Sequence, residues 1–312
     1  MTVRLTLPEV RRLAFDALTA CGATDANAGP VADSIADAEA EGIRNVGLGY
    51  LGHYCEHLRV GKVDGKAMVT VRTPAPATVL VDAAHGFVHP AFEQARPALV
   101  TATRANGIAA MAIDRSYGAG VIGWYVDRLA RDGLVSLGFA NAPKSMAPWG
   151  GRKPFFGTNP FAFAVPREGR PPMVVDQSSS ATAKVNVVNA AARGESIPLG
   201  WALDAEGNPT TDASAGLAGS MAPSGGAKGA AMALVVDLMA AAMTGASFSF
   251  EAAPMANNEG GPPNTGQFFI AMDPERFVGI ERFADRVETE FAAMCAEDGV
   301  RLPGDRRHAH RL

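Results

Sequence analysis

The sequence contains little cysteine. Its three cysteines, Cys21, Cys55 and Cys295, are far apart in a chain of 312 residues. An odd number of widely spaced thiols gives neither a disulfide framework nor the ligand spacing of a zinc site. We therefore expect no metal centre, and the thiols favour a reducing compartment such as the cytoplasm.

Charge is also sparse. Charged residues make up 19% of the chain, the net charge is -4, and lysine and arginine form no stripe along the sequence. A nucleic-acid-binding protein needs a clustered basic surface. We therefore expect no nucleic-acid partner.

No apolar run is long enough to span a bilayer. The richest stretch, GAAMALVVDLMAAAMTG at 229–245, is interrupted by Asp237 and consists largely of alanine. A spanning helix needs about 20 predominantly apolar residues, so this stretch indicates a buried helix. The N-terminal residues MTVRLTLPEVRRLAF lack the apolar core of a secretory signal, so neither export nor a membrane is expected.

Three common catalytic motifs are missing. There is no Gly-x-Gly-x-x-Gly directly after the first predicted strand at 78–84, no Gly-x-Ser-x-Gly and no His-Glu-x-x-His. Their absence excludes a Rossmann fingerprint, a nucleophile elbow and a zinc-protease helix. His53 and His57 lie four residues apart in a predicted helix, but no third ligand accompanies them, so we interpret them as a surface pair.

The chain does contain helix and strand patterns in alternation, which indicates an α/β sheet covered on both faces. The first predicted helix begins at the cap Thr6-Leu7-Pro8-Glu9 and runs to Ala20. Further helices are predicted at 25–42, 47–60, 90–106, 119–132, 181–194, 227–244 and 275–298. Strands are predicted at 78–84, 108–114, 134–141, 161–166, 172–176 and 268–273. An irregular stretch is expected at 196–226 and a mobile loop at 252–266.

Two tight turns are candidates for ligand contacts. The segment Ser116-Tyr117-Gly118-Ala119-Gly120 lies between a strand and a helix, where glycines allow a phosphate to approach backbone N–H groups. The segment Gly157-Thr158-Asn159-Pro160 places two polar side chains at the start of an apolar strand. Each segment is also compatible with a purely structural turn that needs glycine or asparagine, and spacing alone favours that interpretation for 157–160.

Polar residues also follow a strand and open a helix. Asp176 and the serines 178–180 come directly after the strand MVVD, where α/β sheets bind ligands, although the same residues could cap the next helix. Lys228, in PSGGAKG, stands at a glycine-rich helix start that suits an anion. The spacing differs from a P-loop, and a solvated lysine is the alternative.

Taken together, several motifs in order give the chain a resemblance to the type 2 malate/L-lactate dehydrogenase family, which includes sulfolactate dehydrogenases and cyclic ketimine reductases. The resemblance runs through nearly the whole sequence. The motifs that carry it are MAPWGG (146–151), GTNPFAFAVP (157–166), VVDQSSS (174–180), IPLGWALDAEGNPTTD (197–212), PSGGAKG (223–229), QFFIAMDP (267–274) and PGD (303–305).

The resemblance implies a non-Rossmann, mixed-sheet NAD(P)-binding α/β fold with a helical region from both chain ends. It implies NADPH or NADH as the cofactor, a small carboxylated substrate and a homodimer. We expect an N-terminal helical region at 1–72 and a cofactor-binding domain at 73–250. The remaining residues, 251–312, would form a loop, a late strand and a C-terminal helix that packs with the N-terminal region.

The resemblance also implies where the cofactor binds. The turn at 157–160 would line the pocket in which nicotinamide and substrate meet, and the other segments would hold the rest of the cofactor. The cofactor-binding candidates are Ser116, Gly118, Ala119, Gly120, Gly157, Thr158, Asn159, Pro160, Asp176, Ser178, Ser179, Ser180, Lys228, Gly304 and Asp305.

The sequence departs from the family where the family has Ser-His-Gly followed by an arginine. Asn45 replaces the serine, Val46 the histidine and Tyr50 the arginine. The family's second histidine is also missing, because Gly118 stands in its place. His53 lies about 10 Å beyond Val46 along a helix, too far to substitute directly.

This departure bears on the mechanism. Reduction of a ketone needs a hydride and a proton, and valine cannot donate a proton, whereas a protonated imine already carries one. The missing histidine therefore favours a cyclic ketimine carboxylate over a 2-oxo acid, unless Tyr50, Tyr54 or a water donates. Lys144 and Arg115, then Arg44 and Arg152, are candidate cations for a carboxylate. The candidate catalytic residues are Asn45, Tyr50, Tyr54, Lys144 and Asp176.

Two hypotheses follow. The first is an NAD(P)H-dependent oxidoreductase that reduces a small 2-oxo or 2-imino acid, supported by Thr158, Asn159, Asp176 and Lys228. The second is a non-redox descendant that acts as a lyase, an isomerase or a metabolite-binding protein, supported by the loss of both histidines. Binding of a reduced nicotinamide cofactor separates them.

Overall fold

A computed structural model describes residues 4–118 and 120–311. Contacts between residues group the chain into two compact units. Unit 1 comprises Met1–Gly138, Ala162–Asp176 and Phe269–Leu312, and unit 2 comprises Phe139–Phe161 and Gln177–Phe268. The three-segment division at residues 72 and 250 stays a prediction.

Three N-terminal helices open unit 1. They are α1 (Leu7–Ala20), α2 (Asp25–Ala40) and α3 (Leu48–Arg59). The predicted cap of α1 is confirmed, because the Thr6 N–H donates to the Glu9 carboxylate at 2.7 Å and the Glu9 N–H donates back to the Thr6 hydroxyl. Helix α1 packs against both α2 and α3 through its apolar face.

A seven-stranded sheet has the order β1-β2-β3-β10-β4-β5-β6, and most of its residues lie in unit 1. Strands β1 and β2 pair antiparallel, whereas β2 and β3 pair parallel, so the predicted mixed sheet is confirmed. The strands are β1 (Thr70–Ala75), β2 (Thr78–Asp82), β3 (Ile108–Ser116), β4 (Val135–Ala140), β5 (Phe161–Val165), β6 (Met173–Gln177) and β10 (Thr265–Met272).

Every predicted strand is present, and β1 is an additional strand that was not predicted. The segment TVRTPA of β1 is almost fully exposed and contains Pro74, so it lacks the apolar alternation that marks a strand. Proline is tolerated there because β1 is an edge strand, where one row of backbone groups faces no partner strand.

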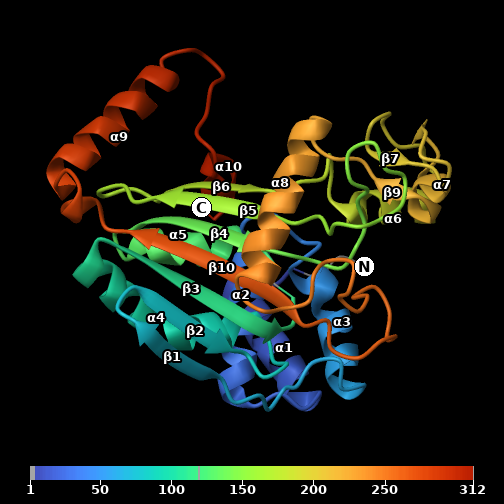
Figure 1. Ribbon diagram of the computed structural model, residues 1–312, viewed down its shortest axis with the longest axis horizontal. Coiled ribbons are helices and arrows are strands. Elements are labelled where there is room, and N and C mark those ends of the chain that lie inside the picture. The colour runs from blue at the N-terminus through green and yellow to red at the C-terminus, as the bar shows by residue number, and fades with distance from the viewer. Residues whose placement is uncertain (1–3, 119, 312) are drawn as a thin grey trace. The chain divides into compact units, whose positions relative to one another are not determined.

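Two helices cover part of this sheet. Helix α4 (Val88–Asn106) packs against β1, β2 and β3, as Figure 1 shows, and α5 (Gly123–Arg131) packs against α4. Between them the rings of Phe92, Tyr125 and Phe269 lie 5.0–5.5 Å apart, which makes an aromatic core.

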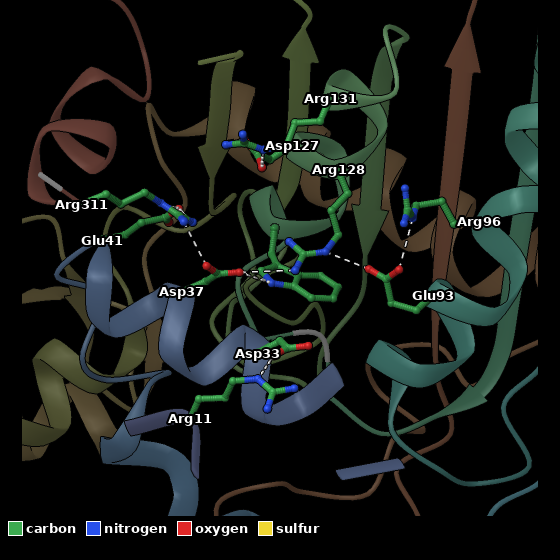
Figure 2. Close-up of polar contacts among 11 residues, drawn as sticks. Arg11, Asp33, Asp37, Glu41, Glu93, Arg96, Asp127, Arg128, Arg131 and Arg311 are labelled. Atoms are coloured by element: carbon green, nitrogen blue, oxygen red, sulfur yellow. Dashed lines mark hydrogen bonds and ion pairs between the residues drawn. The ribbon is translucent and has the colours of Figure 1, made fainter. Parts of the chain in front are cut away.

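A network of charged side chains links α2, α4, α5 and the C-terminal residues within unit 1. Figure 2 shows Asp37 between Arg128 and Arg311, with N–O distances of 3.3 and 2.9 Å. Trp124 Nε1 also donates to Asp37, and the Arg128 guanidinium lies 3.4 Å from the centre of the Trp124 ring. Because these groups are only partly exposed and share partners, the network fixes the first turn of α5.

The C-terminal residues add η2 (Pro274–Arg276), α9 (Ile280–Met294) and α10 (Asp305–His310). Phe283, Val287 and Phe291 of α9 pack with Leu302, Val165 and Met173. The helix predicted at 275–298 is confirmed, although it begins only after Gly279, whose φ of 80° interrupts the preceding turn.

Unit 2 contains a small sheet that the sequence analysis did not predict. Its strands β7 (Ala202–Leu203), β8 (Pro209–Thr210) and β9 (Ser220–Met221) have the order β8-β7-β9, with antiparallel pairs. The expectation of an irregular stretch at 196–226 is therefore wrong. Strands of two residues are too short for an alternating pattern to be recognised.

Helices complete unit 2. They are α6 (Lys184–Arg193), α7 (Ala213–Ala218), α8 (Ala227–Asp237) and the π-helical turn η1 (Leu238–Ala242) that continues α8. Their core includes Met146, Phe156, Val187 and Ile197, each at most 6% exposed. None of the helices that the structure describes is long and apolar enough to cross a membrane.

Candidate active site

The turn Gly157-Thr158-Asn159-Pro160 is built around the side chain of Asn159, which is 0% exposed in unit 2. Asn159 Nδ2 donates to the Ala233 carbonyl at 2.9 Å, and Oδ1 accepts from the Ala142 N–H at 3.3 Å. Asn159 has a φ of 37°, a left-handed conformation that asparagine tolerates better than most residues. A Cβ on Gly157 would lie 2.2 Å from the Ala142 oxygen, so this position requires glycine.

A buried carboxylate completes this arrangement. The Ser249 hydroxyl lies 2.6 Å from Asp237 Oδ1 and 3.0 Å from Asn159 Oδ1. Asn141 Nδ2 donates to Asp237 at 3.3 Å and to the Ser247 carbonyl at 2.8 Å. We call Asn141, Asn159, Asp237 and Ser249 the asparagine network. It holds the turn in place, and whether Asn159 also contacts a cofactor stays a prediction.

The three predicted serines form hydrogen bonds within unit 2. The Ser178 hydroxyl donates to the Thr158 carbonyl at 3.0 Å, and the Ser179 hydroxyl donates to the Asn159 carbonyl at 2.8 Å. The Ser180 hydroxyl donates to the Thr182 carbonyl at 2.7 Å. The structure therefore brings the serines together with the turn at 157–160, as expected for one site.

The start of α8 has features that fit a phosphate group. Gly225 and Gly226 have φ values of 61° and 67°, and a Cβ on Gly225 would meet no atom within 4 Å. Lys228 in the first turn is exposed. The first N–H groups of a helix have no intrahelical acceptor, so they and Lys228 could hold an anion together.

In unit 1, α3 carries a cluster of aromatic side chains that includes two predicted catalytic residues. The ring centres of Tyr50 and Tyr54 are 4.8 Å apart, and Tyr54 packs edge-on against Phe87 and Tyr117. The hydroxyl of Tyr117 forms a hydrogen bond with His57 Nδ1. We call Tyr50, Tyr54, Tyr117, His57 and Phe87 the tyrosine cluster.

Burial controls the acidity of this cluster. Tyr117 and His57 are 0% and 1% exposed, whereas Tyr50 is partly exposed. Burial raises the pKa of Tyr50, and a hydrogen bond with Tyr117 lowers it in part. Burial also raises the pKa of Tyr54 and, together with the neighbouring tyrosines, the pKa of Tyr117. All three hydroxyls therefore keep their protons at neutral pH.

The segment before α3 places Asn45 on the surface and leaves Val46 partly exposed. Glu39 Oε1 accepts from the Leu48 N–H at 2.8 Å, which satisfies a donor at the start of α3. A Cβ on Gly47 would lie 2.5 Å from the same Glu39 oxygen, so a larger residue there would displace the Glu39 carboxylate. A catalytic role for Asn45 stays a prediction.

Asp176 is engaged by its own chain. Its Oδ2 accepts from Arg307 Nη1 at 2.8 Å and from the Gly123 N–H at 3.1 Å. Because the Gly123 N–H lies at the start of α5, the carboxylate also benefits from the positive end of that helix. Arg307 was not anticipated, since it lies 131 residues from its partner.

The other predicted cofactor residues of unit 1 lie near turns. Gly118 and Gly120 have φ values of 54° and 59°, and Ser116 is 1% exposed. Ala119 lies outside the described residues. Gly304 has a φ of 91° and would bring a Cβ to 3.2 Å from the Val174 backbone. Asp305 accepts from the Leu302 N–H at 3.0 Å. Their contact with a cofactor stays a prediction.

The four candidate cations differ in their surroundings. Arg115 forms a two-pronged ion pair with Asp82, so its charge is already partnered. Lys144, Arg44 and Arg152 are exposed, and the Lys144 backbone N–H donates to the Ser249 carbonyl at 2.9 Å. The role of Lys144 toward a substrate carboxylate stays a prediction.

The interpretation of His53 and His57 as a surface pair is wrong for His57, which is buried. Tyr50, Tyr54 and His57 have the spacing i, i+4 and i+7, which puts them on one face of a helix. That spacing was the available signal. Within residues 4–118 and 120–311 no group of three or more histidine, cysteine or acidic side chains gathers as a metal site.

Comparisons with known proteins agree with this architecture. The Malate/L-lactate dehydrogenase family matches residues 5–312. Over 311 residues the chain is 44% identical to the (2R)-3-sulfolactate dehydrogenase (NADP(+)) of Chromohalobacter salexigens, covering 100% of this chain and 92% of that protein. It is 39% identical to the Delta(1)-pyrroline-2-carboxylate reductase of Ancylobacter novellus, covering 99% and 91%.

A solved structure has the same fold. The delta1-piperideine-2-carboxylate reductase from Pseudomonas syringae pvar. tomato superposes with a TM-score of 0.91 at 36% identity, covering 99% of this chain and 93% of that one. The predicted fold class is thereby confirmed. The chain belongs to the malate/L-lactate dehydrogenase family and is an NAD(P)-dependent oxidoreductase.

Proposed function

We propose that this enzyme uses NADPH to reduce small 2-oxo and cyclic 2-imino carboxylates, and that it works as a cytoplasmic homodimer. The observation that carries the proposal is full-length similarity to relatives of both kinds. One is named a sulfolactate dehydrogenase that uses NADP(+), and others are named pyrroline-2-carboxylate reductases. Both reactions move a hydride to or from the carbon next to a carboxylate.

The start of α8 supports the cofactor assignment. Exposed Lys228 and the open space at Gly225 fit a phosphate, and the rigid turn at 157–160 holds partly exposed Thr158 next to partly exposed Ser178. The cofactor, when bound, supplies the hydride. The residues of this chain would position it and exclude water.

Tyr50 is our candidate proton donor. Val46 cannot donate a proton, and Tyr50 lies four residues further on as the partly exposed member of the tyrosine cluster. An alkoxide that forms from a 2-oxo acid needs a proton, and a tyrosine hydroxyl is a competent general acid. A protonated imine already carries its proton, so the cyclic imino acid makes a smaller demand on Tyr50.

Cofactor binding tests the proposal first. We expect the fluorescence of NADPH to be enhanced or shifted to shorter wavelength on mixing with the protein, and NADH to bind more weakly. Lys228→Ala should weaken NADPH binding about tenfold, because one charge-assisted contact is lost. Lys153→Ala, which removes another exposed lysine of unit 2, is the matched control. Absence of binding of either cofactor at millimolar concentration would overturn the proposal in favour of a non-redox function.

Turnover tests the substrate class. We expect NADPH to be oxidised in the presence of Δ1-pyrroline-2-carboxylate, and more slowly with 3-sulfopyruvate, because only the second substrate needs a proton at the reacting atom. Both rates should depend on the substrate carboxylate, so the corresponding amides should be unreactive. Cofactor binding without turnover of either substrate would contradict this assignment.

The homodimer is supported by apolar side chains on α8 and its extension. Leu234, Val235 and Leu238 are 46–47% exposed, which is unusual for neighbouring leucine and valine side chains on one helix. We expect sedimentation equilibrium to give twice the mass of the chain. A monomer at micromolar concentration would remove this part of the proposal.

A further inference from the structure

A line of hydrogen bonds runs through the tyrosine cluster of unit 1. His57 Nδ1 is bonded to the Tyr117 hydroxyl, and the Tyr117 hydroxyl is bonded to that of Tyr50. His57 and Tyr117 are enclosed, whereas Tyr50 is partly exposed. The line therefore connects a buried imidazole to the residue that we propose as the proton donor.

We propose that His57 and Tyr117 form a proton relay that resupplies Tyr50 when the enzyme reduces a 2-oxo acid. The inference rests on the proposed function. Tyr50 is the catalytic residue in this arrangement, and Tyr117 and His57 act through it.

The proton balance of the relay is simple. The cofactor, when bound, would supply a hydride to the carbonyl carbon, and the Tyr50 hydroxyl would give its proton to the carbonyl oxygen. Tyr50 takes the proton of Tyr117, and Tyr117 takes the Nδ1 proton of the His57 imidazolium. His57 is left neutral, all three hydroxyl groups concerned are again protonated, and one proton from solvent restores the imidazolium.

The composition of the cluster supports this role over ordinary core packing. Phe87 packs edge-on against Tyr54 and Tyr117, so an aromatic ring without a hydroxyl is accommodated there. Burying a hydroxyl or an imidazole costs free energy that phenylalanine would avoid. In the cluster the cost is offset because His57 bonds to Tyr117 and Tyr117 bonds to Tyr50.

The acidity of the hydroxyls is also suitable. Burial raises the pKa of Tyr117 and of Tyr50 above the ordinary value, so neither group is stably ionised at neutral pH. A group that passes a proton on must be protonated both before and after the transfer. The cluster therefore conducts a proton and does not store a negative charge.

A second histidine packs beside the ring of Tyr50. The ring of His53 is exposed and its centre is 5.0 Å from that of Tyr50. His53 could supply a proton to Tyr50 from the solvent side. The experiment must therefore separate the enclosed imidazole of His57 from the exposed one.

The two substrate classes provide an internal control. A 2-oxo acid needs a proton at oxygen, whereas a cyclic imino acid already carries one at nitrogen. We expect Tyr117→Phe and His57→Gln to lower kcat for 3-sulfopyruvate by about 10²-fold, the lower range for a general acid, with little change in KM. The rate with Δ1-pyrroline-2-carboxylate should stay within about twofold, because hydride transfer needs no further proton.

The matched control is Tyr125→Phe. Tyr125 is a fully buried tyrosine of unit 1, on α5, and its ring packs against Phe92 and Phe269, outside the relay. This change removes one buried hydroxyl, as Tyr117→Phe does, so it reports what a structural defect alone costs. We expect it to affect the two substrates equally.

A readout without cofactor or substrate complements the kinetics. The imidazole proton at His57 Nδ1, assigned by its loss in His57→Gln, should give a strongly downfield NMR signal because Tyr117 holds it in a hydrogen bond. The signal should shift in Tyr117→Phe and stay unchanged in Tyr125→Phe. A His57 Nδ1 proton with the same chemical shift in Tyr117→Phe as in the native protein would overturn the relay.

The kinetic outcomes decide the rest. Equal losses with both substrates in Tyr117→Phe would assign Tyr117 a packing role and overturn the relay, while leaving the proposed function intact. Selective loss of 2-oxo acid reduction in His53→Gln but not in His57→Gln would make the exposed imidazole the proton source, and would also overturn it. A native enzyme that binds NADPH but reduces neither substrate would refute the proposed function itself.

Discussion

The asparagine network of unit 2 and the tyrosine cluster of unit 1 are both buried and polar, but their hydrogen bonds lead to different kinds of group. In the asparagine network every amide, hydroxyl and carboxylate contact leads back to the protein's own backbone or to another member. In the tyrosine cluster the line of hydrogen bonds from His57 ends at Tyr50, which is partly exposed.

This difference indicates different functions. A closed network of this kind fixes the backbone to which it bonds, here the left-handed Asn159 and the turn that follows Gly157. An open line keeps a hydroxyl that can face a substrate. Changes in the first should therefore affect folding, and changes in the second should affect chemistry.

The largest expected effect on stability comes from removing a side-chain amide from the asparagine network. Asn159→Ala removes the side-chain hydrogen bonds to the Ala142 N–H and the Ala233 carbonyl and forces alanine into a φ of 37°. We expect a loss of about 3 kcal/mol of unfolding free energy, measured by urea denaturation. The control is Asn186→Ala, which removes an exposed hydrogen bond from the Asn186 side-chain amide to the Thr182 hydroxyl. It should lower the unfolding free energy by less than about 0.5 kcal/mol. Similar costs for both variants would show that the network is not closed.

A smaller effect is expected from a buried imidazole that belongs to neither network. Within the described residues, both ring nitrogens of His89 lack a hydrogen-bond partner, and burial, followed by Arg128, lowers its pKa to about 3. The unfolded chain binds a proton near pH 6.5 and the folded one does not, so stability falls as the pH drops from 6.5 toward 3.

Because of His89, the unfolding free energy of the native protein should fall by about 1.5 kcal/mol when the pH is lowered from 6.5 to 5. The difference between the native protein and His89→Phe, each denatured with urea at both pH values, isolates this contribution. Parallel stability curves for the two proteins would show that the His89 pKa is not lowered.

The smallest effect on stability should come from removing a hydroxyl from the tyrosine cluster. Tyr117→Phe keeps the ring that packs against Tyr54 and Phe87 and removes only the hydroxyl. We expect a loss of about 1 kcal/mol of unfolding free energy, near the lower net value for the two hydrogen bonds that the hydroxyl makes. A loss equal to that of Asn159→Ala would mean that the cluster carries the fold, and would erase the distinction between the two regions.

Much of the fold could be predicted from local pattern. The apolar runs at 108–114 and 161–166 are strands, and Asn106-Gly107 ends α4, because run length, alternation and left-handed glycine act within a few residues. Strand β1 and the two-residue strands of unit 2 were missed because they are exposed or too short to show a period. Their pairing depends on distant partners.

The candidate site was predicted less completely for the same reason. The glycine turns and the serines are consecutive in sequence, so their patterns could be recognised. Asp237 was noticed only as an interruption in an apolar helix, and its partner Asn141 lies 96 residues away. Tyr117 was interpreted only as part of a glycine turn, because nothing in its neighbourhood reveals a bond to His57, 60 residues earlier.

The most direct measurement is the ratio of the two reductions in Tyr50→Phe. With its hydroxyl removed, kcat/KM for 3-sulfopyruvate should fall by about 10²-fold or more, while the value for Δ1-pyrroline-2-carboxylate stays near that of the native enzyme. If the variant reduces both substrates as the native protein does, Tyr50 donates no proton and the replacement of the family's histidine must be sought elsewhere.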